Sequence, residues 1–365
     1  MGKISADFST AKLDISVDVI RTVAIAAVIF LHATADLTVI QMNQFEIVRW
    51  ATNDVYQSVG RMCVPLFVML SGALLLQPEK HDTLVSFFKK RWARIGLPWI
   101  FWGAVYFAWD FLVNQQPLTS KAVVQGILTG PYYHFWYLYM LLGLYLLTPV
   151  MRLLLPKVKR VTIKCYLGLW FIGAAILPFA FALTNISLFS NLFTNAGWVG
   201  YLLFGLAGYF ILGTYLFNVQ FRRSILSILV ALGVAFTAIS IYIIQSPIGG
   251  NRDVFAFTVY FGPWTILAAA ALFLLLNTIK IPTQTTSSHR GAKLLSIISQ
   301  NTLPIFLFHI IVLESLQRGY LGFAINGNTV NSIVGVPLIT VITLFVSLGI
   351  ILLLKRVPYL RRLIG

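Results

Sequence analysis

The chain has 365 residues, of which 58% are hydrophobic and only 10% are charged, and its formal net charge is +16. Soluble domains carry about a quarter charged residues, so this composition excludes an ordinary soluble globular protein and indicates a membrane protein. The positive charge does not indicate nucleic-acid binding, because it is not gathered in a basic domain or a groove-reading motif.

Ten apolar segments reach the length that a helix needs to cross a bilayer. They are residues 17–40, 55–76, 95–112, 133–155, 165–183, 197–217, 224–244, 254–276, 297–316 and 332–354. No hydrophilic insertion between them is large enough to form a second domain. We therefore expect an all-α fold in which residues 1–365 form one membrane-embedded unit with about ten transmembrane helices.

The basic residues are concentrated in alternate connections between these segments. One side of the membrane receives most of the 27 lysines and arginines, including those of both chain ends. The positive-inside rule places that side, and therefore both termini, in the cytoplasm. Most of the net charge is thus explained as a topology signal.

Arg21 and His32 lie eleven residues apart within the first apolar segment. Eleven helical steps of about 100° return to within about 20° of the same face, and they separate the two side chains by about 16 Å along the axis. Burying an arginine in hydrocarbon costs about 3 kcal/mol or more, so such groups usually face a protein interior or a water-filled cavity. This stripe predicts a functional site.

The predicted topology puts His32, His134 and His309 in the outer half of the membrane. Histidine suits proton transfer because its ordinary pKa is near 6.5, and it usually needs an acceptor on its second ring nitrogen. Asp36 and Glu314 are the candidate acceptors. Each histidine can alternatively be a packing residue that bonds a neighbour. We expect no metal site, because no His-x-x-x-His or Glu-x-x-His spacing is present.

A second cluster of charge precedes the third apolar segment. Arg91 and Arg94 are three residues apart and share a helical face. With Lys90 and Arg21 they form a cationic mouth suited to a phosphorylated ligand, because guanidinium groups bind phosphate in bidentate fashion. The alternative is ordinary anchoring by positive charge on the cytoplasmic side.

Several motifs, taken in chain order, make the sequence resemble the integral-membrane acyltransferase family 3, which includes bacterial O-acetyltransferases of surface polysaccharides. They begin with the Arg21-x10-His32 spacing. They continue with Val64-Pro65-Leu66-Phe67-Val68-Met69-Leu70-Ser71-Gly72, Arg91-x-x-Arg94 before Leu97-Pro98-Trp99, His134-Phe135-Trp136-Tyr137-Leu138, and Asn301-Thr302-Leu303-Pro304-Ile305-Phe306-Leu307-Phe308-His309. Ala73 and Phe308 depart from residues that are frequent in the family, at positions not expected to do chemistry.

The resemblance implies a bacterial plasma (inner) membrane enzyme that moves an acyl group, usually acetyl from acetyl-CoA, to a sugar hydroxyl of a surface or lipid-linked glycan. Acetyl-CoA is then a substrate, and no cofactor is permanently bound. His32 is expected to act as general base, with Asp36, His309 and Glu314 beside it in the reaction. The donor is expected to bind Arg21, Lys90, Arg91 and Arg94, and the other substrate contacts are expected at Ser71, His134 and Trp136.

Several alternatives stay open at this point. Direct attack on the thioester and a transient acyl-histidine are both compatible with a histidine base. The leading function of another class is a secondary transporter of a small polar or anionic solute, although no internal repeat or matched pair of broken helices supports it. Membrane lipid surrounds the protein in either case, and a homo-oligomer is one option for its assembly.

Overall fold

We describe the protein from a computed structural model, which covers residues 4–34, 47–77, 83–184, 197–245, 260–279, 286–326 and 329–365. These residues form helices and connecting turns and contain no strand, which confirms the all-α prediction for this part of the chain. The helices are α1 (Ile4–Ala33), α3 (Ile47–Gly60), α4 (Cys63–Leu75), α5 (Leu84–Arg91), α6 (Leu97–Leu112), α7 (Ser120–Thr129), α8 (Trp136–Leu154), α9 (Arg160–Phe171), α10 (Leu177–Thr184), α12 (Gly197–Leu216), α13 (Arg223–Gln245), α15 (Pro263–Asn277), α16 (Thr286–Gln300), α17 (Thr302–Gln317), α18 (Ser332–Leu354) and α19 (Pro358–Leu363).

Within the described residues, seven helical stretches are long and apolar enough to cross a membrane, or eight if the bent pair of α16 and α17 forms one span. Two further apolar helices coincide with predicted segments, but their described parts, Gly205–Leu216 and Pro263–Asn277, are shorter. The protein is therefore a multi-pass membrane protein. Among the described residues, the helices that are long and apolar enough to span a membrane are fewer than the ten predicted. The orientation of the termini stays a prediction.

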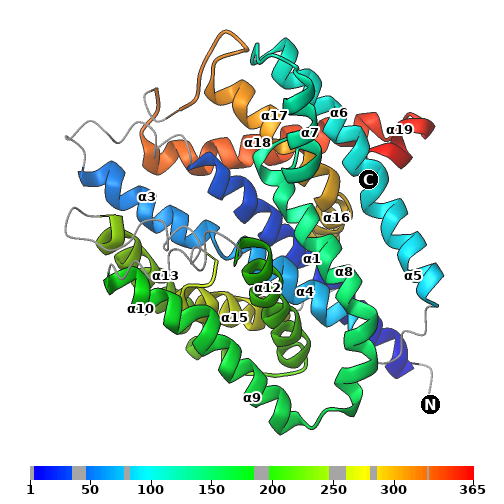
Figure 1. Ribbon diagram of the computed structural model, residues 1–365, viewed down its shortest axis with the longest axis vertical. Helices are drawn as coiled ribbons and strands as arrows, with labels where there is room; N and C mark the ends of the chain where they lie inside the picture. Colours follow the sequence, from blue (N-terminus) through cyan, green and yellow to red (C-terminus); the bar gives the residue numbers. More distant parts are fainter. Residues whose placement is uncertain are drawn as a thin grey trace.

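Helix α1 is the central element of the bundle and runs obliquely through its middle (Figure 1). It packs against six helices, namely α3, α4, α15, α16, α17 and α18. Ile20, Ala24, Ile25 and Ile29 on this helix are fully buried. Because neighbours surround it, its polar side chains face protein rather than lipid, as the cost of a charge in hydrocarbon requires.

Helices α4 and α12 approach each other closely through two glycines. A Cβ atom on Gly72 would lie 1.8 Å from the Phe210 carbonyl oxygen, and one on Gly213 would lie 2.0 Å from the Met69 carbonyl oxygen. Small residues allow the backbones of membrane helices to come this close, and dispersion contacts then stabilise the pair. The glycine after Ser71 thus has a packing role that fixes where α4 presents its side chains.

The chain bends by 78° between α16 and α17, with Asn301 at the break. The predicted continuous segment 297–316 is therefore wrong as a single straight helix. Because of the bend, α17 begins as a new helix at Thr302, and its first backbone N–H groups have no partner within that helix. Tyr106 on α6 then ties α17 in place, because its hydroxyl donates to the Leu307 carbonyl at 2.8 Å.

Candidate functional site

A cavity of about 240 Å³ lies between α1, α4, α8, the start of α17 and the segment that joins α5 to α6. We call it the arginine cavity. Its polar lining consists of three arginines, Arg21, Arg91 and Arg94, together with four residues that carry hydroxyl groups, Ser71, Tyr137, Tyr145 and Thr302. Three guanidinium groups around one cavity give it a positive electrostatic potential suited to an anionic ligand.

Arg91 and Arg94 reach the arginine cavity from different kinds of helical turn. Arg91 ends α5, and Arg94 lies in a π-helical turn, Trp92–Gly96, that leads into α6. The Arg91 guanidinium lies over the ring of Phe87 at 5.2 Å and over that of Tyr145 at 5.4 Å. These cation–π contacts hold Arg91 at the wall, whereas Arg94 is exposed at the mouth.

A second, much smaller cavity of about 20 Å³ adjoins the first, and we call it the histidine chamber. It is lined by His32 from α1 and Cys63 from α4, by His134 in the turn before α8, by Trp136 and Tyr137 at the start of α8, and by Tyr260 before α15, among apolar neighbours. A cavity of about 10–15 Å³ already holds one water molecule, so the chamber has room for a small reacting group rather than for a whole sugar.

The three predicted histidines lie together. The ring centres of His32 and His309 are 5.3 Å apart, and those of His134 and His309 are 5.6 Å apart. His134 and His309 are fully buried, whereas His32 is half-buried. The described residues contain no group of three or more His, Cys, Asp or Glu side chains arranged to hold a metal ion.

Hydrogen bonding determines which nitrogen of His309 carries a proton. Its Nδ1 atom lies 2.7 Å from the Phe306 carbonyl oxygen, and a carbonyl only accepts, so Nδ1 is the donor. The other nitrogen, Nε2, has no hydrogen-bond partner among the described residues, and neither has either ring nitrogen of His134. Of the two histidines with unpaired nitrogens, His134 lines the histidine chamber and His309 packs against His134. Unpaired buried nitrogens are costly, so their presence beside the chamber indicates a site built for a polar ligand.

An aromatic partition, formed by Phe67, Tyr137 and Phe306, separates the two cavities, because each of its three residues lines both of them. The ring of Tyr137 lies 6.2 Å from that of Phe67 and 5.3 Å from that of Phe306. Phe306 also contacts the imidazoles of His134 and His309, at 5.4 and 5.9 Å. The arginines and the histidines therefore stand on opposite sides of one aromatic layer.

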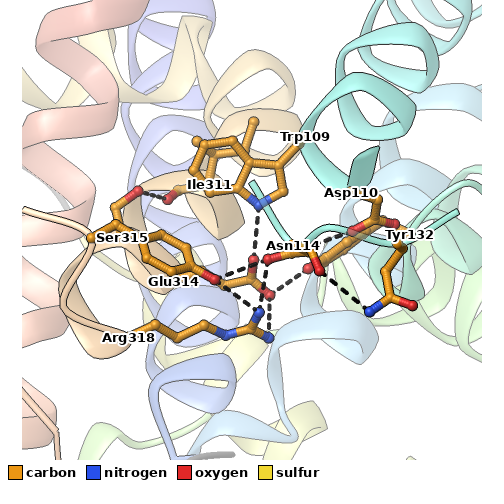
Figure 2. Close-up of polar contacts among 10 residues, drawn as sticks. Trp109, Asp110, Asn114, Tyr132, Ile311, Glu314, Ser315 and Arg318 are labelled. Atoms are coloured by element: carbon orange, nitrogen blue, oxygen red, sulfur yellow. Dashed lines mark hydrogen bonds and ion pairs between the residues drawn. The ribbon is translucent and has the colours of Figure 1, made fainter. Parts of the chain in front are cut away.

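Glu314 does not take the predicted place beside the histidines. Five helical residues rotate it by about 140° from His309, toward α6. There its carboxylate accepts hydrogen bonds from Trp109 Nε1 at 3.0 Å, from the Tyr132 hydroxyl, and from Arg318 at 3.0 Å (Figure 2). Figure 2 also shows Asn114 continuing this network toward Asp110.

The hydrogen-bond network of Glu314 positions the residues that follow Tyr132 in the chain. The next residue, Tyr133, places its ring 5.2 Å from that of His32, edge to face, and His134 comes directly after it. Because Tyr132 is bonded to Glu314, this short segment is held against α17. Glu314 therefore positions the histidines indirectly, by fixing the segment that carries Tyr133 and His134.

The remaining predicted residues are distributed unevenly. Ser71 lines the arginine cavity, whereas Trp136 lines the histidine chamber and packs on Tyr260 with ring centres 5.6 Å apart. Lys90 is exposed on α5 and is not part of the cavity lining. Asp36 lies outside the described residues.

Sequence reasoning missed the partition residues as a group. Phe67, Tyr137 and Phe306 come from three helices, and each falls inside a quoted motif where it looks like an ordinary apolar residue of a transmembrane segment. Only their shared position between two cavities distinguishes them. Tyr133 is hard to distinguish by sequence for the same reason, since an aromatic residue at a helix end is typical of the membrane interface.

One comparison with known proteins identifies the family of the chain. A family model described as an acyltransferase domain, that of acyltransferase family 3, matches residues 14–352. The comparisons with curated proteins and with solved structures return no match. The matched range includes every residue that lines the two cavities. The family model matches nearly the whole length of this chain, so the chain belongs to acyltransferase family 3.

Proposed function

We propose that this acyltransferase moves an acetyl group from acetyl-CoA to a sugar hydroxyl of a surface or lipid-linked glycan, in the bacterial plasma membrane, with His32 as general base. The observation that supports it most is the pair of cavities that share the aromatic partition. One cavity carries the cations that a phosphorylated donor requires, and the other carries the imidazoles that proton transfer requires.

The arginine cavity is the donor site in this proposal. Arg21, Arg91 and Arg94 bind the phosphate groups of CoA through charge-assisted hydrogen bonds. The first turn of α17 adds to them, since Thr302 and Leu303 line the cavity at a helix N-terminus, where backbone N–H groups and the helix dipole favour anions. The positive-inside rule puts this cavity on the cytoplasmic side, where acyl-CoA is found.

The span of the donor agrees with the positions of the two sites. His32 is about 16 Å further along α1 than Arg21, which is of the order of an extended pantetheine arm. A donor whose phosphates stay in the arginine cavity can therefore bring its thioester past the aromatic partition to the histidine chamber. The partition keeps water from the thioester, and exclusion of water limits hydrolysis as a side reaction.

We assign the chemical step to the residues that line the histidine chamber. His32 takes the proton of the acceptor hydroxyl while the hydroxyl oxygen attacks the carbonyl carbon of the thioester. The carbon–sulfur bond then breaks, and the departing CoA sulfur receives the proton from the His32 imidazolium. His309, with its proton held at Nδ1 by Phe306, presents Nε2 as a further proton acceptor in the same cluster.

A transporter fits the same number of helices less well. A carrier needs a pathway that opens alternately to both sides, usually between related halves. The family match favours an enzyme, and the chamber is too small to carry a solute without rearrangement. Purified protein that releases CoA from radiolabelled acetyl-CoA is an enzyme, whereas protein that moves label across a vesicle membrane without releasing CoA is a carrier.

The test of the mechanism is His32→Ala. A general base contributes about 10²- to 10⁴-fold to a rate, so transfer is expected to fall by that factor. The dissociation constant of CoA is expected to stay unchanged, because His32 lines only the histidine chamber. Transfer at the wild-type rate by His32→Ala protein would remove His32 from the mechanism.

A further inference from the structure

Tyr137 carries a hydroxyl group that the mechanism above does not use. It lines both the arginine cavity and the histidine chamber, and it is only 9% exposed. Its ring is held by the two other members of the partition and by Trp136, whose ring centre lies 6.2 Å away. The phenol therefore has a fixed orientation between the two cavities.

The Tyr137 hydroxyl is available to a ligand. Within the described part of the chain, none of the hydrogen bonds involves it, in contrast to the hydroxyls of Tyr106 and Tyr132 nearby, which are bonded to α17. A buried tyrosine hydroxyl normally finds a partner, so a donor at this junction indicates a bound polar group.

Other tyrosines near the site do not share this position. Tyr145 lines only the arginine cavity, and Tyr260 lines only the histidine chamber. A thioester whose phosphates stay with Arg21 and whose carbonyl reaches His32 has to pass Tyr137. Tyr137 is therefore the tyrosine that such a thioester meets on its way to His32.

We infer that Tyr137 is a catalytic residue whose hydroxyl donates a hydrogen bond to the carbonyl oxygen of the thioester. This inference rests on the proposed function. As the acceptor oxygen forms its bond to the carbonyl carbon, the electron pair of the C=O bond moves to the oxygen, and the Tyr137 O–H stabilises that negative charge without transferring its proton. The pair returns when the carbon–sulfur bond breaks. A donor fixed in advance in a site of low dielectric stabilises an oxyanion effectively.

The experiment compares Tyr137→Phe with Tyr139→Phe in the full chain. Tyr139 lies on the same helix, but its hydroxyl donates to the Ile127 carbonyl at 2.5 Å and it lines neither cavity. Membrane vesicles from cells that express each variant receive radiolabelled acetyl-CoA, and both CoA release and label transferred to glycan are measured. The dissociation constant of CoA is measured on the purified proteins.

Loss of one oxyanion donor lowers a turnover number by about 10²- to 10³-fold. We expect this fall for Tyr137→Phe with unchanged CoA affinity, and wild-type turnover for Tyr139→Phe. Turnover within twofold of wild type in Tyr137→Phe overturns the inference even if His32→Ala is inactive. If the wild-type protein neither releases CoA from acetyl-CoA nor labels glycan, the proposed function fails by itself, so the two failures are distinguishable.

A second variant keeps the test decisive if the phenylalanine substitution impairs folding. Difluorotyrosine at position 137 preserves the shape and the hydroxyl, and its more acidic O–H donates a stronger hydrogen bond. At a fixed neutral pH its turnover number is expected to exceed that of the wild type, because a stronger donor stabilises the oxyanion more. A turnover number equal to that of the wild type contradicts the role of Tyr137 as a hydrogen-bond donor.

Discussion

Replacing Arg91 with alanine is expected to weaken CoA binding strongly while the protein still folds. The guanidinium lines the arginine cavity and is only half-exposed, with the rings of Phe87 and Tyr145 against it. Aromatic neighbours exclude water from one side of the charge, so its hydrogen bonds to a phosphate are only partly screened. The side chain is thus more effective than an exposed arginine.

The magnitude follows from the usual contribution of a hydrogen bond to a charged group, about 1.5–3 kcal/mol. Since 1.4 kcal/mol corresponds to a tenfold change in affinity, Arg91→Ala raises the dissociation constant of CoA by about 10- to 150-fold. Arg94 is exposed at the mouth of the cavity, so solvent screens it and Arg94→Ala has a smaller effect. Arg91→Lys is intermediate, because lysine keeps the charge but loses the bidentate geometry.

The assay is titration of the purified full chain with CoA by calorimetry, at a fixed ionic strength. Arg160→Ala is the matched control, since Arg160 is an exposed arginine at the start of α9 that lines neither cavity. If Arg91→Ala binds CoA as tightly as Arg160→Ala, the arginine cavity is not the donor site and its charges are only topology anchors.

Three further predictions concern packing, positioning and water exclusion. Gly213→Ala is expected to lower the free energy of unfolding by about 1–3 kcal/mol, because the new methyl group clashes with the Met69 carbonyl. The control Gly349→Ala has no atom within 4 Å of the new methyl group, so equal thermal stability of the two variants contradicts the prediction. Glu314→Ala leaves Trp109 Nε1 without an acceptor, so we expect reduced acetyl transfer at unchanged CoA affinity. Glu314→Gln is expected to recover transfer, and equal transfer by the two variants argues against a positioning role. Phe306→Leu thins the partition, so CoA release without acceptor should increase, and an unchanged hydrolysis rate shows that the ring does not exclude water.

The family and the helical class were predictable from the sequence because both depend on local patterns. Apolar segments of spanning length give the helices, and the Arg21-x10-His32 spacing needs only helical periodicity to put both residues on one face. The bend at Asn301 was not predicted, since an apolar run looks the same whether it is straight or bent. The close contact of Gly72 with Phe210 likewise needs a partner helix that is distant in sequence.

For the site, the residue types indicated the chemistry, but which of these residues lie together depended on packing. A histidine or an arginine in a membrane helix is costly wherever it lies, so His32 and Arg21 could be singled out by identity alone. Which side chains meet depends on the rotation and crossing of helices, and no local pattern encodes it. Only the tertiary structure packed the three histidines against one another, turned Glu314 away toward Trp109, and placed Tyr137 where the two cavities join.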